Sequence, residues 1–267
     1  MPIHLHVEDS GGTGRPVVLI HGWPLSGKAW EKQVPALAGR GYRVITYDRR
    51  GFGASEKPAD GFNYSTLAQD LADVINGRSL RDVTLVGFSM GGGEVARYVA
   101  EQGQDLLRSV VFASAVPPYL LQGPNNPEGP LTQEQAKAWE TALKADSEKF
   151  FDDFTRNFFT ANGELKVSEA ERQKALALCR QADLTATLGC MNAFGTTDFR
   201  EDLKKVAVPT LVLHGDADGI VPFEGSGKRT HAAIPRSQLK LLAGAPHGCN
   251  VSHADEFNSA LTEFLEA

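Results

Sequence analysis

Short runs of apolar residues, each bounded by Gly, Pro, Asn or Asp, recur along the chain. Most of these runs are nearly continuous in Val, Leu and Ile, which is typical of parallel strands that are buried on both faces. They predict strands at residues 16–20, 42–47, 83–86, 106–113, 208–213 and 239–242, after a first candidate strand at residues 3–7.

Amphipathic helical patterns separate several of these runs. Residues 65–75 place four apolar side chains on one face behind Ser65, which is the predicted N-cap, and residues 91–102 and 252–265 are spaced similarly. Alternating strands and helices predict an α/β fold, with a mostly parallel, twisted sheet covered by helices on both faces.

The alternation stops in residues 117–200. A loop rich in Gly, Pro and Asn at 123–130 leads there into charged, Ala-rich and Phe-rich helical stretches, and no strand is evident. Ligands bind at the carboxyl ends of the strands in open α/β sheets, so we interpret this insertion as a helical cap over a site. The core would then comprise residues 1–116 and 201–267; the alternative is a helical layer far from any site.

Composition narrows the function classes. The 267 residues carry a net charge of −6 and contain three cysteines without CxxC or Cys/His metal spacing. The sequence shows no basic patch that would bind nucleic acid. It also shows no signal peptide and no apolar run that could form a membrane helix. We expect a cytoplasmic protein that binds neither nucleic acid nor membrane. The sequence leaves open whether it forms a homo-oligomer.

The sequence Gly87-x-Ser89-x-Gly91 carries the clearest chemical signal. A predicted strand runs directly into it and a predicted helix leaves it, which describes the sharp turn that exposes a nucleophilic serine above a sheet. The flanking glycines are needed because a Cβ atom would collide across so tight a turn. The alternative is that Ser89 merely caps the helix.

A serine needs a base and an acid to become nucleophilic. Among seven histidines, His247 follows the last predicted strand and precedes the C-terminal helix, whereas His21 and His214 resemble hydrogen-bonded packing residues. The candidate acids are Asp216 and Asp218, which local chemistry does not separate.

Two backbone N–H groups are candidates for binding an oxyanion. The turn His21-Gly-Trp-Pro could direct the N–H of Trp23 at Ser89, opposite the N–H of Met90. The Trp23 side chain could at the same time be a simple packing aromatic.

Five ordered motifs, His21-Gly-Trp-Pro, Asp48-Arg-Arg-Gly-Phe-Gly-Ala-Ser, Gly87-Phe-Ser-Met-Gly-Gly-Gly, His214-Gly-Asp-Ala-Asp and Ala245-Pro-His-Gly, resemble the α/β-hydrolase superfamily. They are most similar to its bacterial arylesterases and cofactor-free haloperoxidases (perhydrolases), over almost the whole chain. The resemblance implies the α/β-hydrolase fold, usually with one more N-terminal edge strand than this chain has.

The resemblance also implies the roles of individual residues. Ser89 would be the nucleophile, His247 the base and Asp218 the acid, with Trp23 and Met90 supplying the oxyanion N–H groups. A serine at the elbow argues against epoxide hydrolases and dehalogenases of this fold, which carry Asp there. No cofactor and no metal are implied.

Pro24 follows the first oxyanion donor. In the resembling perhydrolases, a proline here marks good perhydrolysis, with the preceding carbonyl thought to accept a hydrogen bond from hydrogen peroxide. The alternative is that Pro24 only stiffens the turn.

We therefore expect a serine carboxylic-ester hydrolase that acts on small esters through an acyl-enzyme, with perhydrolase side activity. A lactonase or γ-lactamase, or a carbon–carbon bond hydrolase, would use the same triad, and a small-molecule receptor is a further alternative. Phe194, Ile220 and Val221 are expected to line an apolar pocket, unless they are ordinary core residues. Cys249 has no independent base and is not expected to be a nucleophile.

Overall fold

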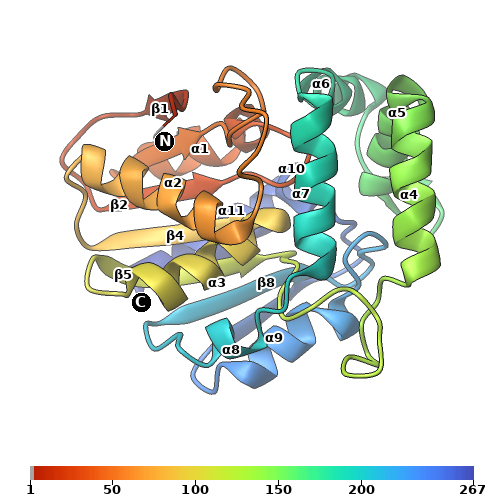
Figure 1. Ribbon diagram of the computed structural model, residues 1–267. Coiled ribbons are helices and arrows are strands. Elements are labelled where there is room, and N and C mark those ends of the chain that lie inside the picture. The colour runs from red at the N-terminus through yellow and green to blue at the C-terminus, as the bar shows by residue number, and fades with distance from the viewer. Residues whose placement is uncertain (1–2) are drawn as a thin grey trace.

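A single seven-stranded sheet organises the computed structural model, which describes residues 3–267 (Figure 1). Its order is β1-β3-β2-β4-β5-β8-β9, and every neighbouring pair is parallel except β1 with β3. The strands are β1 (Val7–Asp9), β2 (Pro16–Ile20), β3 (Arg43–Tyr47), β4 (Val83–Phe88), β5 (Leu107–Ala113), β8 (Thr210–Gly215) and β9 (Gln238–Leu242). This architecture confirms the predicted α/β class.

Helices cover both faces of the sheet (Figure 1). On one face α1 packs against α11, and on the other α2 packs against α3, α3 against α8 and α8 against α9. These helices are α1 (Gln33–Ala38), α2 (Tyr64–Gly77), α3 (Met90–Gln102), α8 (Arg200–Leu203), α9 (Gly227–Ala233) and α11 (Ala254–Glu266), joined by the short turns η1 (Gly27–Trp30), η2 (Phe223–Gly225) and α10 (Cys249–Ser252).

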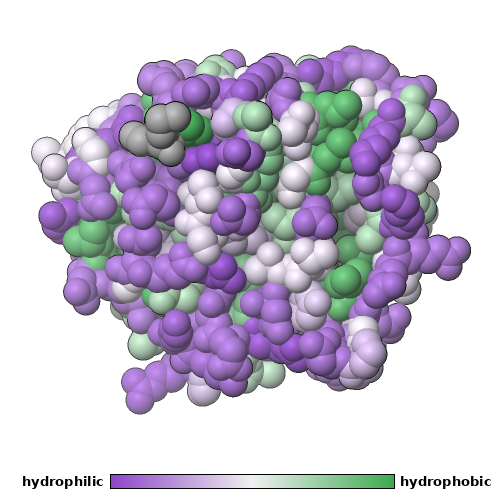
Figure 2. Space-filling model, viewed as in Figure 1, coloured by the Kyte–Doolittle hydropathy of each residue, from purple (hydrophilic) through white to green (hydrophobic). Residues whose placement is uncertain are grey.

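Four further helices lie between β5 and β8 in the chain, on the right of Figure 1. They are α4 (Gln133–Ala145), α5 (Ser147–Phe158), α6 (Glu169–Cys179) and α7 (Leu184–Thr196). On the face shown in Figure 2, apolar side chains gather mainly beside these helices, whereas the helices over the sheet present mostly hydrophilic residues. Among the described residues, no helix is both long and apolar enough to span a bilayer.

Three local expectations need correction. The first strand begins at Val7, not at residue 3, and its polar residues Glu8 and Asp9 are tolerated because β1 is an exposed edge strand. The N-cap of α2 is Asn63, whose side chain accepts the N–H of Thr66, and Ser65 lies inside the helix.

The inserted segment also contains strand, contrary to the expectation from its sequence. Two short strands, β6 (Thr160–Ala161) and β7 (Glu164–Leu165), pair as a hairpin through Asn162 and Gly163. Both turn residues have positive φ angles, of 53° and 80°. An Asn-Gly pair strongly favours such a turn, so this signal was present in the sequence.

A buried ion pair ties α3 to the loop after β3, and a further hydrogen bond of its arginine reaches the end of β2. Arg49 Nε donates to Glu94 Oε1 at 2.5 Å, and Tyr47 donates to Glu94 Oε2 at 2.6 Å. Arg49 Nη2 also donates to the carbonyl of His21 at 2.6 Å, immediately before the Gly22–Trp23 turn. Because Arg49 and Glu94 are both fully buried, each charge depends on the other for stabilisation.

We expect the substitution Glu94→Gln to lower the free energy of unfolding by about 3–5 kcal/mol, because it leaves the Arg49 charge buried without a counter-ion. Urea denaturation monitored by circular dichroism measures this value. The matched control is Glu101→Gln on the same helix, which removes the charge of a surface pair with Arg97, while the glutamine can still accept the hydrogen bond from Ser65; it should cost less than about 1 kcal/mol. Equal losses in the two variants would contradict a structural role for the buried pair.

Candidate active site

The turn between β4 and α3 holds Ser89 in a strained conformation. Its φ and ψ angles are 54° and −118°, a region that residues with a Cβ atom seldom adopt. A Cβ atom on Gly87 would lie 2.5 Å from the Gly91 carbonyl oxygen, and one on Gly91 would lie 2.6 Å from that of Ile20. The two glycines therefore allow the turn to be tight enough to present the Ser89 hydroxyl at the carboxyl edge of the sheet.

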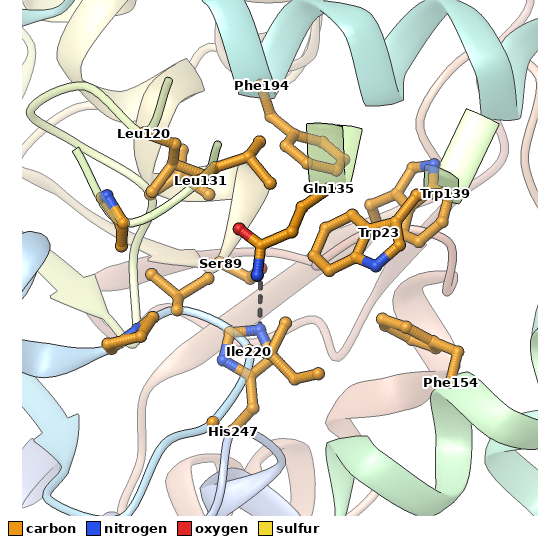
Figure 3. A pocket seen from close by; sticks show the side chains of 15 residues that line it. Trp23, Ser89, Leu120, Leu131, Gln135, Trp139, Phe154, Phe194, Ile220 and His247 are labelled. Atoms are coloured by element: carbon orange, nitrogen blue, oxygen red, sulfur yellow. Dashed lines mark hydrogen bonds between the residues drawn. The ribbon is translucent and has the colours of Figure 1, made fainter. Parts of the chain in front are cut away.

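A chain of hydrogen bonds connects Ser89 to His247 and Asp218. His247 Nδ1 lies 2.7 Å from Asp218 Oδ2, and His247 Nε2 lies 2.9 Å from Ser89 Oγ. A carboxylate can only accept, so Nδ1 carries the proton, and Nε2 is free to accept the proton of the Ser89 hydroxyl. Figure 3 shows the bond between Ser89 and His247 at the floor of a cavity.

The structure separates the two candidate acids. Asp216 Oδ1 accepts the backbone N–H of Gly244 at 2.6 Å and braces a turn. Asp218 is instead buried beside His247. The structure thus brings Asp218, and not Asp216, into contact with His247.

Asp218 is surrounded by donors. Its Oδ1 accepts the backbone N–H groups of Ile220 at 2.9 Å and Val221 at 2.8 Å, and its Oδ2 faces His247 Nδ1 and His214 Nε2. Burial raises the pKa of the Asp218 carboxyl, but the charge of His247 and the hydrogen bonds from His214 and His247 outweigh burial and hold this pKa well below its usual range. The carboxylate is therefore ionised when it orients His247.

Two backbone N–H groups belong to residues that adjoin Ser89, Trp23 in the cavity wall and Met90 in the chain. Met90 is the first residue of α3, and Trp23 follows the Gly22 turn at the end of β2. Neither N–H has a backbone acceptor among the described residues. Both therefore stay available for an oxygen that develops negative charge.

The cavity above Ser89 has a volume of about 160 Å³. The predicted residues Trp23, Phe194, Ile220 and Val221 line it together with Ser89 and His247, whereas Pro24 is buried and lies outside the lining. The other lining residues are Val116, Leu120, Pro130, Leu131, Gln135, Trp139, Phe154, Gly219 and Pro222.

Trp23 joins this turn to the inserted helices. Its ring packs edge-on against Phe150, Phe154 and Phe194, and its indole N–H donates to the Thr187 carbonyl at 3.0 Å. The packing role considered for this side chain is therefore present, and it leaves the backbone N–H available.

Known proteins resemble the chain in sequence and fold. The family model for the alpha/beta hydrolase fold matches residues 15–254. A non-heme chloroperoxidase from Kitasatospora aureofaciens is 43% identical over 257 residues, covering 95% of this chain and 93% of the relative. The chain belongs to the non-heme haloperoxidase group of the α/β hydrolases.

Two further members of the α/β-hydrolase family resemble the chain over nearly their whole lengths. A bifunctional esterase/perhydrolase from Acinetobacter calcoaceticus is 35% identical, covering 99% of this chain and 97% of the relative. The crystal structure of a bromoperoxidase from Bacillus anthracis superposes with a TM-score of 0.97 at 52% identity, covering 100% of this chain and 97% of that one.

Sequence reasoning missed two polar residues in this α/β-hydrolase site. His214, interpreted as a packing residue, lies 3.3 Å from Asp218 through Nε2, which also bonds the Val221 carbonyl at 2.9 Å. The motif His214-Gly-x-x-Asp218 carried this signal. Gln135 lines the cavity from the first turn of α4, and its only sequence signal was the capping pattern Thr132-x-x-Gln135.

Cys249 and the residue types that bind metals were the other candidates for a reactive group among the described residues. Burial raises the pKa of the Cys249 thiol to about 12, so the group stays protonated at neutral pH. Among residues 3–267, no cluster of three His, Cys, Asp or Glu side chains could hold a metal ion.

The low pKa of Asp218 predicts how stability depends on pH. A carboxyl whose pKa is lower in the folded than in the unfolded protein stabilises the fold above the unfolded value of about 3.9, and this contribution is lost as the pH falls toward the folded value. The difference in the free energy of unfolding between the wild type and Asp218→Asn should therefore shrink as the pH is lowered through 4. Urea denaturation at a series of pH values measures it; a difference that grows on acidification would contradict the assigned direction.

Proposed function

We propose that the protein is a serine hydrolase of small carboxylic esters that works through an acyl-enzyme on Ser89. The observation that carries the proposal is the continuous hydrogen-bond chain from Ser89 through His247 to Asp218, at the floor of a cavity. The esterase/perhydrolase named among the relatives supports the same chemistry.

The geometry supports the following role for each group in the first half-reaction. The Ser89 hydroxyl gives its proton to His247 Nε2 while Oγ attacks the acyl carbonyl carbon. The N–H groups of Trp23 and Met90 stabilise the oxygen that becomes negative. Asp218 stabilises the protonated imidazole, which then gives its proton to the departing alcohol.

The second half-reaction removes the acyl group. Water gives a proton to His247 and attacks the same carbonyl carbon; the bond to Ser89 Oγ breaks, and the proton returns to Oγ. Hydrogen peroxide can replace water in this step and yields a peracid by the same proton movements. A peracid oxidises halide ions, so one acyl-enzyme accounts for both the chloroperoxidase and the esterase named among the relatives.

The cavity supports a preference for small substrates. A volume of about 160 Å³ is below the range of about 300–1,000 Å³ typical of drug-sized ligands. The aromatic rings of Trp23, Phe154 and Phe194 stand at its wall, so a short acyl group fits better than a long chain.

We further propose that residues 117–200 act as a cap on the core formed by residues 1–116 and 201–267. This role is supported by seven cavity residues that the segment contributes: Leu120, Pro130, Leu131, Gln135, Trp139, Phe154 and Phe194. A cytoplasmic location, our remaining proposal, is supported by three buried cysteines that form no disulfide.

Replacing Ser89 by Ala should lower kcat/KM for p-nitrophenyl acetate roughly 10³-fold or more, as in comparable triad deletions. The release of p-nitrophenol measures this loss. The matched control is Cys249→Ala, which removes the other nearby candidate nucleophile and should keep most of the activity. Wild-type rates in the Ser89→Ala variant would disprove the proposal.

Pro24 is expected to influence perhydrolysis through the Trp23 carbonyl that it positions. One hydrogen bond to bound peroxide contributes about 0.5–1.5 kcal/mol, so Pro24→Leu should lower the ratio of perhydrolysis to hydrolysis roughly 2- to 12-fold. Both products can be quantified in one assay of a short ester with hydrogen peroxide. An unchanged ratio would reduce Pro24 to a residue that stiffens the turn.

A further inference from the structure

Gln135 presents an uncommitted side-chain amide to the active-site cavity. The other described lining residues with a side-chain hydrogen-bonding group are Ser89, His247, Trp139 and Trp23, and the indole N–H of Trp23 already donates to the Thr187 carbonyl. Figure 3 shows this side chain reaching into the cavity from α4, toward Ser89 and His247. The proposed hydrolytic mechanism gives it no role.

The capping interaction of α4 fixes the orientation of this amide. Gln135 Oε1 accepts the backbone N–H of Thr132 at 3.0 Å and its hydroxyl at 3.0 Å. If the amide were turned over, its NH₂ group would face the N–H of Thr132, placing two donors together. The oxygen is therefore committed to the helix cap.

The nitrogen is consequently free for a ligand. Gln135 Nε2 makes no hydrogen bond within residues 3–267, and Figure 3 shows it on the His247 side of the amide. His247 protonates the departing alcohol, so a donor on this side lies nearer to the alcohol part of an ester than to its acyl part. The surrounding wall is mainly aliphatic and aromatic, so the side-chain donors that it offers a substrate oxygen are the Gln135 amide and the indole N–H of Trp139.

We propose that Gln135 is a specificity-determining residue that selects short-chain esters of alcohols with a second oxygen close to the ester, such as glycol and polyol esters. This inference rests on the proposed ester hydrolysis and adds the substrate class. Gln135 Nε2 donates to the ether or hydroxyl oxygen on the alcohol portion of the bound ester.

Paired acetate esters test this selection. The ether oxygen of 2-methoxyethyl acetate replaces one methylene of butyl acetate, so the ratio of their kcat/KM values reports on the hydrogen bond. Dividing the wild-type ratio by that of a variant removes the difference in intrinsic reactivity. A neutral hydrogen bond should make this quotient roughly 2- to 12-fold for Gln135→Leu.

Gln135→Glu separates the donor from the helix cap. Glutamate can still accept the N–H of Thr132, so thermal stability should be retained, but its second oxygen cannot donate. We expect the preference for 2-methoxyethyl acetate to be lost in this variant as well. The matched control, Gln133→Leu on the same turn of α4 but outside this cavity, should keep the wild-type ratio.

The outcomes are distinguishable. A quotient near one for both Gln135 variants, with butyl acetate hydrolysis intact, would overturn the assigned role of Gln135. The role would also be overturned if the Gln135 variants lost only a preference for phenyl methoxyacetate over phenyl butanoate and kept the preference for 2-methoxyethyl acetate. The selected oxygen would then lie on the acyl side of the ester. If the proposed function itself were wrong, the wild-type protein would hydrolyse butyl acetate no faster than the Ser89→Ala variant does.

Discussion

The strained backbone of Ser89 is the constraint around which the rest of the site is arranged. A positive φ of 54° at a residue with a Cβ atom persists only where its surroundings hold it. Those surroundings include a fully buried strand before the turn, the glycines at 87 and 91, and the backbone hydrogen bond from Ser89 N to the Ala113 carbonyl at 2.9 Å. The strain places the hydroxyl above the sheet edge, where a base can reach it.

The parallel order of the sheet brings the remaining groups to that edge. The strands β2, β4 and β8 end at the same side, so the loops that follow them deliver Trp23, Ser89 and Asp218 to one region although they are far apart in the chain. His247 arrives from the loop after β9. The inserted helices then enclose this edge, and Trp23 connects them to the turn after β2 through the Thr187 carbonyl.

Features with local causes could be predicted from the sequence. Continuous apolar runs located six of the sheet strands to within about two residues, and the motif Gly87-x-Ser89-x-Gly91 located the turn that carries Ser89. Both features are set by residues that are close together in the chain. The contacts of His214 and Gln135 were harder to predict, since the first depends on the conformation of the loop after β8 and the second on how distant segments pack. His214 meets Asp218 only after the loop beyond β8 folds back, and Gln135 meets the cavity only after α4 is placed over the sheet.

The central claim is that one acyl-enzyme precedes both hydrolysis and perhydrolysis. Its most direct test measures the ratio of peracetic acid to acetic acid that the enzyme forms at a fixed peroxide concentration. The substrates are methyl, phenyl and p-nitrophenyl acetate, which differ only in the leaving group. The background measured with Ser89→Ala is subtracted from each product. A common acetyl-enzyme has already lost its alcohol when peroxide and water compete, so the account predicts the same ratio for all three esters. A ratio that varies with the leaving group would show that peroxide and water attack the ester itself, and would contradict the account.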